Sequence, residues 1–469
     1  MASVLLENSS NSFFKSPQTT HSIADPEENN FAALILKEAR TFLYNEDTKR
    51  RYRMKSNQFI RKSPLTFART VSFLMFDSNK SLNTRLNAFF DDGAFDQELC
   101  PPTVSALCQA RFKVNPFIFQ AWNQKLLQFF YTSREHQVPI KRWHGRLLYA
   151  IDGTKIRMPD TPSTRRKCQV IQDRFSEAGT VQANFSLLHD VLNKIPIHFM
   201  CHGHWSEKEF VLRDHLACCP QDAIVIMDRL YGDYSIVAAF FTAGVDFVIR
   251  GKLGVTFLEI MDFLQGSKNE EIVTLRVPPS QKKLIQRQHW PESIRVRLIK
   301  VALSNGETEI LITSLLDATK YPIEEFKELY FQRWNVETAF GIFKNRLEVE
   351  RFSGMHEQTI VQDLYAMVFL ITLEEFLTLE SNNHLATRCR EKERKYLYQV
   401  KKSAAFSIIN KKWVNLFLKL ELPAKNVVKG LQHSFIRQTE AVRPGRAYPR
   451  KKLTPSQRLN YHLYRKKHV

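Results

Sequence analysis

The sequence has few of the features that mark secreted, disulfide-rich or membrane proteins. Its seven cysteines are scattered, with no C-x-x-C pair and no Cys/His ladder at zinc-finger spacing, which predicts reduced thiols. Residues 1–16 lack a charged segment followed by an apolar run, so we expect no signal peptide. The longest apolar run, around Ala366–Ile371, is far too short to span a bilayer. These absences predict a soluble intracellular protein.

The sequence has fewer acidic residues than basic ones. The 469 residues include 68 Lys and Arg against 48 Asp and Glu, which gives a net charge of +20 and a pI near 9.6. Such an excess predicts a polyanionic partner, and nucleic acid is the commonest one. A basic protein without such a partner is the alternative. The length exceeds the usual limit for a single core, so two or more domains are expected.

The composition of the N-terminal third changes at about residue 30. Residues 1–30 are rich in Ser, Asn and Thr and are predicted to be disordered, whereas 31–140 carry apolar residues at helical spacing and are predicted to form a helical DNA-binding domain. Inside this domain, Lys49–Lys62 contains seven cations and no acid. We expect it to contact DNA phosphates, through Lys49, Arg50, Arg51 and Arg53 among others, and a solvated face is the alternative.

Two aspartates follow apolar strands in the middle of the chain. RLLYAID predicts a strand that ends at Asp152, and AIVIMD predicts a buried strand that ends at Asp228. Active sites of α/β folds commonly lie at such strand ends, although a turn-forming or capping role is the alternative for either residue alone. Together with a later helical Glu they would suit Mg²⁺ or Mn²⁺, and three carboxylates can hold two such ions.

The remaining pattern predicts an α/β catalytic core that is interrupted once. Short strands and helices alternate in a way that indicates a sheet of mixed direction. The segments that we expect are the first part of the core (141–252), a β-rich insertion (253–317), the second part of the core with a strongly helical segment (318–385), and a basic helical C-terminal region (386–469).

The stretch YFQRWNVETAFGIFK, residues 330–344, places a phenol, a guanidinium, a carboxylate and an ammonium group on one predicted helix. Arg333, Glu337 and Lys344 follow Tyr330 by three, seven and fourteen residues. On a straight helix these positions fall within an arc of roughly 60°. Surface salt bridges along an exposed helix are the alternative, but they explain neither the presence of Tyr330 nor the presence of two cations for a single acid. A phosphate-handling face with metal on Glu337 explains all four residues.

Tyr330, Arg333, Glu337 and Lys344 match the spacing Y-x2-R-x3-E-x6-K, which is the signature of bacterial insertion-sequence DDE transposases of the IS-four type. AIDGTKIRMPDT around Asp152 and MDRLYG around Asp228 also resemble the two Asp motifs of that family. The separations of 76 and 109 residues between successive acids suit its layout. The resemblance covers roughly residues 146–379.

This resemblance implies a ribonuclease-H-like core with a DDE triad of Asp152, Asp228 and Glu337 that binds Mg²⁺ or Mn²⁺, as two ions. It implies cut-and-paste transposition in the bacterial cytoplasm, on the nucleoid, by a homodimer that binds terminal inverted repeats and target DNA. In relatives, the Tyr, Arg and Lys of the signature hold terminal phosphates, and a tryptophan of the insertion stacks on a flipped base. Trp290 is the candidate here, with a core role as the alternative.

Other polar residues near these motifs have weaker patterns. Arg250 and Lys252 end a predicted strand and are expected DNA contacts, with a solvated strand end as the alternative. Asp160 and Glu207 lie near the motifs, but turn or cap roles are favoured for them. His202, His204 and His215 lack metal-ligand spacing and are predicted to be core or surface residues.

Two functions besides transposition remain open from the sequence. One is a DNA-bound regulator, or domesticated transposase, that no longer cuts. The presence of all three acids together with Tyr330, Arg333 and Lys344 argues against it, since a site that no longer catalyses cleavage does not need these residues. The other is a nuclease with the same core that acts without specificity for element ends.

Overall fold

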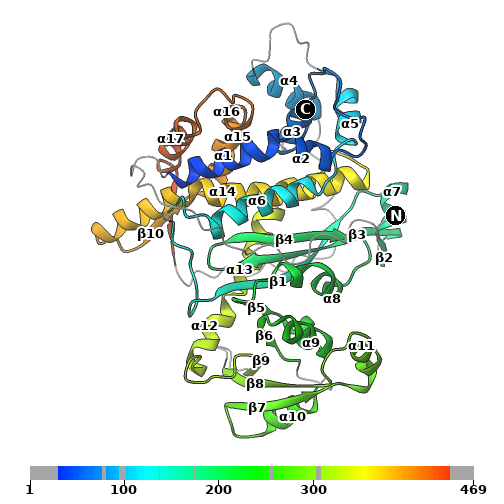
Figure 1. Cartoon of the computed structure of the whole chain (residues 1–469), viewed down its shortest axis with the longest axis vertical. Helices are drawn as coiled ribbons and strands as arrows, with labels where there is room; N and C mark the ends of the chain where they lie inside the picture. The colour runs from blue at the N-terminus through cyan, green and yellow to red at the C-terminus, as the bar shows by residue number, and fades with distance from the viewer. Residues whose placement is uncertain are drawn as a thin grey trace.

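The computed structural model of the chain describes residues 30–76, 81–93, 102–136, 138–173, 176–252, 257–302 and 308–443. The predicted disordered segment 1–30 lies outside the described residues except for Asn30, and so does the cation-rich tail from residue 444 onward. A layer of helices and a large sheet make up the described part, with the helices from both ends of the chain gathered on one side (Figure 1).

The described strands form one nine-stranded sheet and one two-stranded ribbon. The ribbon joins β10 and β11, and the large sheet has the order β2-β3-β1-β5-β6-β9-β8-β7, with β4 also paired to β3. The strands are β1 (Leu147–Arg157), β2 (Gln169–Asp173), β3 (Ser176–Asp190), β4 (Ile195–His202), β5 (Ala223–Met227), β6 (Asp246–Arg250), β7 (Glu270–Arg276), β8 (Ser293–Ala302), β9 (Thr308–Thr313), β10 (Leu397–Val400) and β11 (Thr439–Val442).

The described α-helices are α1 (Phe31–Tyr44), α2 (Glu46–Tyr52), α3 (Phe67–Met75), α4 (Leu82–Gly93), α5 (Val104–Arg111), α6 (Ile118–Thr132), α7 (Pro162–Lys167), α8 (Glu207–Phe210), α9 (Tyr234–Ala243), α10 (Leu258–Gln265), α11 (Lys282–Arg287), α12 (Phe326–Phe331), α13 (Trp334–Gly341), α14 (Glu357–Glu391), α15 (Lys402–Lys411), α16 (Trp413–Phe417) and α17 (Ala424–Phe435). Two π-helical segments, η1 (Val211–His215) and η6 (Ile342–Arg346), follow α8 and α13 directly. Short 3₁₀ turns are η2 (Leu216–Cys218), η3 (Arg229–Tyr231), η4 (Pro279–Gln281) and η5 (Ile323–Glu325).

The centre of the large sheet has the strand arrangement of a ribonuclease-H-like core. β1, β3 and β4 form an antiparallel meander, and β5 and then β6 continue the sheet parallel to β1. All five residues of β5 are buried, as the apolar sequence AIVIM requires for a strand covered on both faces. The mixed sheet and its helical flanks confirm the predicted fold class.

The strands of the predicted β-rich interval extend this sheet. β9 pairs with β6 in antiparallel fashion, and β8 and β7 follow outward. The edge of β6 is therefore covered by the chain itself, which removes an open row of backbone donors and acceptors. The helices α10 and α11 lie with these strands, at the end of the molecule farthest from the N-terminal helices (Figure 1).

The 35-residue helix α14 is the axis of the helical layer. It packs against α1, α3 and α6 from the N-terminal part, against α15 and α17 from the C-terminal part, and against β4. The fully buried ring of Trp122 on α6 stacks on Phe369 of α14, with 4.3 Å between ring centroids. N-terminal and C-terminal segments therefore share one core (Figure 1).

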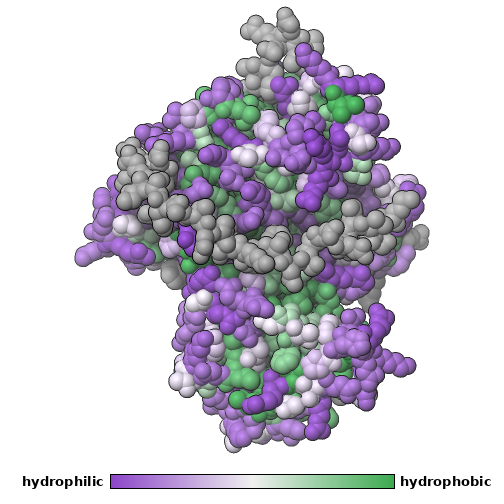
Figure 2. Space-filling model, viewed as in Figure 1, coloured by the Kyte–Doolittle hydropathy of each residue, from purple (hydrophilic) through white to green (hydrophobic). Residues whose placement is uncertain are grey.

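The amide side chains of α6 join the helical layer to the edge of the sheet. Gln120, Asn123 and Gln124 donate hydrogen bonds to backbone carbonyls of β4. These amides satisfy acceptors that an edge strand would otherwise leave open. Figure 2 shows that hydrophilic residues cover most of the visible face over the helices, whereas hydrophobic residues reach the surface over the lower part of the sheet.

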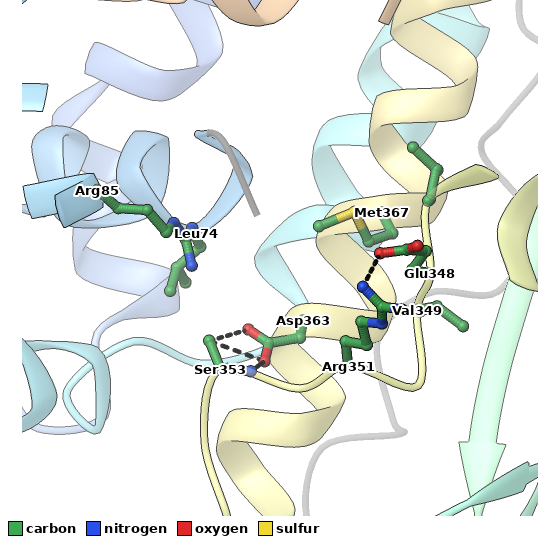
Figure 3. Close-up of a pocket in the computed structure, with 9 residues that line it drawn as sticks. Leu74, Arg85, Glu348, Val349, Arg351, Ser353, Asp363 and Met367 are labelled. Atoms are coloured by element: carbon green, nitrogen blue, oxygen red, sulfur yellow. Dashed lines mark hydrogen bonds and ion pairs between the residues drawn. The ribbon is translucent and has the colours of Figure 1, made fainter. Parts of the chain in front are cut away.

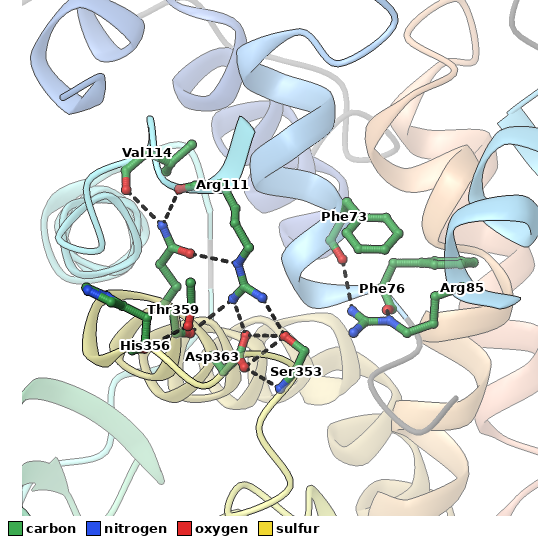
Figure 4. A network of polar contacts seen from close by, with 10 residues as sticks. Phe73, Phe76, Arg85, Arg111, Val114, Ser353, His356, Thr359 and Asp363 are labelled. Carbon is green, nitrogen blue, oxygen red and sulfur yellow. Dashed lines mark hydrogen bonds and ion pairs between the residues drawn. The ribbon is translucent and has the colours of Figure 1, made fainter. Parts of the chain in front are cut away.

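A buried polar network ties α5 to α14 and to the segment that follows α13 (Figure 4). Arg111 donates to Asp363 at 2.8 Å, to Gln362 at 3.1 Å and to Ser353 at 2.8 Å. It also donates to the backbone carbonyl of Thr359 at 3.0 Å. The side chains of Arg111 and Asp363 are only 2% and 9% exposed, so this ion pair depends on its full set of hydrogen bonds.

A small pocket lies beside this network, between α3, α4 and the segment after α13 (Figure 3). Its volume is ≈ 20 Å³, which is room for about one water molecule. Glu348 and Arg351 form an ion pair of 2.6 Å at its wall. The pocket is therefore a packing gap between the helical layer and the core, far smaller than a small-molecule site.

None of the helices in the described part of the chain combines the length and apolar character that a bilayer crossing requires.

Replacement of Arg111 by Ala should destabilise the chain strongly, because it leaves the buried carboxylate of Asp363 without its cation. We expect the free energy of unfolding to fall by about 3–5 kcal/mol, measured by urea denaturation at pH 7. Arg165→Ala serves as the control, since its pair with Asp160 is exposed and should leave the unfolding midpoint nearly unchanged. Equal midpoints for both variants would contradict the role assigned to the network.

Two buried histidines of the sheet resist protonation. Burial lowers the pKa of His189 on β3 to about 3, and the charges of Lys402 and Lys194 act in the same direction. Burial also lowers the pKa of His198 on β4 to about 4. In the unfolded chain these imidazoles have a pKa near 6.5. Acid therefore adds protons to the unfolded state before it adds them to the folded state.

Stability should be fully present above pH 6.5 and should decline as the pH falls from 6.5 toward 4. Each such histidine accounts for about 2 kcal/mol of loss at pH 5. Unfolding free energies from urea titrations between pH 8 and pH 5 measure the slope, and His189→Gln should make it shallower. The same substitution at the exposed His384 is the control. An unchanged slope in His189→Gln would show that this histidine is not responsible.

Candidate active site

Asp152 and Asp228 lie side by side because of the register between two parallel strands. β1 pairs with β5, and the last pair of this ladder is Ile151 opposite Met227. The next residue after each of these is an aspartate, so the ladder places the two carboxylates at the same level of the sheet. β5 ends just before Asp228, but the prediction that a strand ends at Asp152 was wrong, because β1 stays paired with β3 as far as Arg157. The negative charge of Asp228 contributes to a raised pKa of Asp152, as expected of near neighbours.

The surroundings of Asp152 disfavour its negative charge. Burial raises the pKa of Asp152 to about 7, and the charges of Asp228 and Glu207 act in the same direction. The N–H of Gly153, which donates to Asp152 Oδ1 at 2.9 Å, and the guanidinium of Arg333 act against this rise. A carboxylate in such a position gains from any further cation beside it.

Asp228 also caps the short turn that follows β5. Its Oδ1 accepts a hydrogen bond from Leu230 N at 2.8 Å at the start of η3. The capping role that the sequence left open for Asp228 is therefore real. It is compatible with a place in the site, because the cap fixes the carboxylate at the strand end beside Asp152.

The segment that carries Glu337 is not one straight helix. The N–H groups of Arg333 and Val336 bond to carbonyls three residues back, which tightens the chain between α12 and α13. The π-helical segment η6, which contains Lys344, follows α13. A 3₁₀ turn rotates by more than 100° per residue and a π turn by less, so the narrow arc predicted for a straight helix does not describe the four signature residues.

Arg333 lies between two acids of the predicted triad. Its Nη2 donates to Glu337 Oε1 at 3.0 Å, and its Nη1 lies 3.7 Å from Asp152 Oδ2. Arg333 is 8% exposed, and its guanidinium lies over the rings of Trp334 and Tyr330 at 5.2 and 5.8 Å from their centroids. α13 packs against β1, which brings Glu337 to the side of the sheet that holds Asp152.

Tyr330 and Arg250 lie on the side of the site toward β9. Arg250, at the end of β6, forms an ion pair of 2.8 Å with Glu309 of β9. Burial raises the pKa of Tyr330 to about 12, with Arg333, Glu309, Arg250 and Asp228 as the charges that act on it. The hydroxyl of Tyr330 is buried and has no hydrogen-bond partner among the described residues.

Lys344 contacts the strand of Asp152 from the opposite end of α13. Its Nζ donates to the backbone carbonyl of Lys155 on β1 at 2.7 Å. Burial lowers the pKa of Lys344, and the charge of Glu350 acts against this shift. The contact fixes Lys344 three residues along β1 from Asp152, so the signature lysine and the first acid share one strand.

The donor set suits a divalent cation, although it does not form a finished metal cage. Asp152, Asp228 and Glu337 offer hard carboxylate oxygens of the kind that Mg²⁺ and Mn²⁺ prefer. In the described part of the chain, no group of three or more His, Cys, Asp or Glu side chains is arranged to hold a metal ion. Arg333 occupies the position between Asp152 and Glu337, so this guanidinium would have to move for all three acids to share a cation.

The other predicted DNA contacts lie outside this cluster. Trp290 follows α11 and is partly buried against the hydrophobic core, so the core alternative has structural support. Lys252 is half-buried just after β6. In the basic stretch, Lys49 and Arg50 pair along α2 with acids that precede the stretch, Glu46 at 2.9 Å and Asp47 at 3.3 Å.

The rest of the basic stretch is divided between bonded and exposed cations. Arg53 donates to the carbonyl of Gln58 at 3.1 Å. Four cations are exposed, namely Arg51, Lys55, Arg61 and Lys62. Lys49 and Arg50 are paired with acids of α2, so the positive charge that remains on the surface of the stretch comes from these four cations.

The histidines that the sequence discounted have structural contacts. His215 is buried, with one ring nitrogen 2.9 Å from His198 and the other 2.9 Å from Ser186 Oγ. His202 Nδ1 accepts hydrogen bonds from the backbone N–H groups of His204 and Trp205. These contacts support core and turn roles.

Of the two acids that the sequence discounted, one lies at the surface and the other lies in the site. Asp160 is half exposed and paired with Arg165. Glu207 instead contacts Gly153, the residue after Asp152, and the charge of Asp228 adds to a burial-driven rise in the pKa of Glu207. No motif spacing points to Glu207, and the only sequence signal is a glycine next to Asp152 that leaves room for another side chain.

Known transposases are similar to this chain. Residues 143–373 match the family described as the transposase DDE domain. Over 296 residues the chain is 24% identical to the transposase InsG for insertion sequence element IS4 from Escherichia coli (strain K12), and the match covers 60% of this chain and 62% of that protein. The chain therefore matches less than two thirds of the length of this relative.

A solved cryo-EM structure of the piggyBac transposase synaptic complex with hairpin DNA aligns with 89% of this chain and 85% of that chain, at 10% identity and a TM-score of 0.40. The family match spans Asp152, Asp228 and Glu337, and together with the similarity to InsG it supports the assignment of residues 143–373 to a DDE transposase domain of the IS4 type.

Proposed function

We propose that this chain is a DNA transposase that binds the terminal inverted repeats of its insertion sequence, hydrolyses phosphodiester bonds at the ends and joins the freed 3′-hydroxyls to target DNA. The observation that carries the proposal is that the β1–β5 ladder places Asp152 and Asp228 side by side, with the guanidinium of Arg333 between Asp152 and Glu337. This chemistry needs acidic side chains that bind a metal ion and cationic side chains that bind phosphate.

DDE transposases depend on divalent metal ions, and in this proposal the ions are two Mg²⁺ or Mn²⁺ held by Asp152, Asp228 and Glu337. When bound, such ions supply an activated water or hydroxyl and neutralise charge on the leaving oxygen. The chain's own part is to hold the three carboxylates on rigid elements. The β1–β5 ladder sets the spacing of the two aspartates, and the packing of α13 on β1 sets the approach of Glu337.

Arg333 has two kinds of partner in this mechanism. Without DNA it neutralises Asp152 and Glu337, which would otherwise repel each other at a half-buried site. A phosphate of the transposon end offers the same planar group a bidentate partner. Transfer of Arg333 from carboxylate to phosphate would release the acids for the metal, so DNA binding and assembly of the acid site are coupled in this mechanism.

The partner in this proposal is double-stranded DNA, first the element ends and then the target. Tyr330, Arg333 and Lys344 bind the terminal phosphates, and the exposed cations of the basic stretch bind DNA farther from the cut. A homodimer follows because two ends must be cut and joined together, with one acid site for each. We place this activity in the bacterial cytoplasm, on the nucleoid.

Cleavage of a labelled transposon-end duplex with Mg²⁺ tests the triad. Asp152→Ala, Asp228→Ala and Glu337→Ala should each lower the cleavage rate by more than about 10²-fold, because each removes an acid on which the reacting centre depends, while binding of the duplex is retained. Asp160→Ala, at a half-exposed surface pair, is the control and should cut like the wild type.

The same assay separates the alternatives. Normal cutting by any one of the three triad variants would refute its assigned role. A wild-type chain that shifts the duplex without any metal-dependent product would be a regulator. Equal cleavage of unrelated duplexes would indicate a nuclease without specificity for element ends.

The basic stretch should contribute phosphate contacts. Combined Gln substitutions at Arg51, Lys55, Arg61 and Lys62 should flatten the dependence of DNA affinity on salt, by up to about 0.9 in log–log slope for each phosphate that is no longer neutralised. Fluorescence anisotropy between 50 and 300 mM salt would measure the slope. Lys37→Gln, on the exposed face of α1, is the control. A slope equal to that of the wild type would place the DNA elsewhere.

A further inference from the structure

Glu207 lies against the glycine that follows Asp152. It is the first residue of α8, the short helix between β4 and β5. A Cβ atom added to Gly153 would come within 2.7 Å of both Cδ and Oε1 of Glu207. Any side chain at position 153 would therefore displace the carboxylate. The glycine allows a fourth acid to approach β1 beside Asp152.

The carboxylate of Glu207 is placed where its negative charge is unfavourable. Its Oε2 is buried and forms no hydrogen bond of ordinary geometry with the described residues. Asp228 and Asp152 are both close enough for their negative charges to act unfavourably with that of Glu207. A buried carboxylate oxygen without a well-placed donor is costly unless a cation or another donor binds it.

A fully buried phenol is directed at the same group of acids. The side chain of Tyr231, in η3, is 0% exposed, and the charges that act on it are those of Glu207, Asp152 and Asp228. Its hydroxyl is near enough to Glu207 to lower the pKa of that carboxyl, yet it forms no hydrogen bond of ordinary geometry in the described part of the chain. A poorly bonded hydroxyl among three carboxylates indicates a polar centre whose full set of partners includes a ligand.

Helix capping does not account for Glu207. The N-terminus of α8 is capped by a reciprocal pair, in which Ser206 Oγ accepts from Glu209 N and Glu209 Oε2 accepts from Ser206 N. The neighbouring Lys208 pairs with Asp233. Local partners thus explain the two charged residues that follow Glu207, whereas the carboxylate of Glu207 is directed at the site.

We propose that Glu207 is a fourth acid of the active site and contributes a carboxylate oxygen to the binding of an oxygen-preferring divalent cation beside Asp152 and Asp228. The proposal deepens the proposed function and rests on it. On this basis the site has four carboxylates on four elements, namely β1, the start of α8, the end of β5 and α13. Gly153 and Tyr231 define the space in which Glu207 lies.

Binding of Mn²⁺ to the full-length chain in complex with an unlabelled transposon-end duplex tests the proposal without a measurement of cleavage. Free Mn²⁺ is measured by electron paramagnetic resonance during titration. Glu207→Gln should weaken Mn²⁺ binding by about tenfold or more, as loss of a ligand or its close support does. Glu209→Gln removes the same charge from the same helical turn and should bind Mn²⁺ like the wild type. Wild-type Mn²⁺ affinity in Glu207→Gln would overturn the proposal.

Thermal unfolding separates a site role from a structural one. In EDTA, Glu207→Gln should unfold at the same temperature as the wild type or above it, because one of three neighbouring negative charges is removed. With the duplex bound, the increase in midpoint on addition of Mn²⁺ should be smaller than for the wild type. A lower midpoint in EDTA would assign Glu207 to the packing of the fold and overturn the proposal.

Gly153→Ala provides a second route that keeps every acid in place. The added methyl group must displace Glu207, so this variant should also lose Mn²⁺ affinity. Combined with Glu207→Gln it should cause no further loss, because both changes act on the same carboxylate. Fully additive losses would show that Gly153 acts through Asp152 and would contradict the proposed position of Glu207.

Asp152→Asn distinguishes failure of this inference from failure of the proposed function. If Asp152→Asn loses Mn²⁺ binding and Glu207→Gln does not, the metal centre remains and only the fourth acid is refuted. If Asp152→Asn binds Mn²⁺ like the wild type, the proposed metal centre itself is refuted, and the role of Glu207 with it.

Discussion

The side-by-side placement of Asp152 and Asp228 is the constraint on which the rest of the site depends. The parallel ladder between β1 and β5 ends at Ile151 and Met227, so both carboxylates follow at one level after two segments, Leu147–Ile151 and Ala223–Met227, whose residues are all buried. Two like charges side by side at a half-buried site are unfavourable by themselves. The surrounding elements supply what offsets them, and the guanidinium of Arg333 does so most directly.

Arg333 reaches the acids because the chain is tightened between α12 and α13. The 3₁₀-like bonds at this point change the direction of the side chain relative to a straight helix, and the π-helical segment changes that of Lys344. Irregular turns of this kind weaken local hydrogen bonding and are common at functional sites. The same irregularity leaves one cation beside the carboxylates and directs the other to the backbone of β1, so the two have different tasks.

Much of the fold was predictable because its signals are local. Apolar runs such as AIVIM predict strands, and the motifs around Asp152, Asp228 and Glu337 identify the family without any coordinates. The pairing of β9 with β6 was not predictable, since strand partners far apart in sequence leave no periodic trace. The basic stretch alone does not predict that Lys49 and Arg50 are paired, because their acidic partners on α2 precede the stretch.

The sequence by itself determined the resemblance to the transposases, because three acids, a phenol and two cations occur at the spacing of a known transposase signature. Only the tertiary structure decided how these groups neutralise one another. It placed Arg333 between Asp152 and Glu337, and it brought Glu207 against Gly153. The physical reason is that charge compensation depends on distances between residues far apart in the sequence. Neither the β1–β5 register nor the approach of α8 to β1 can be predicted from the local sequence.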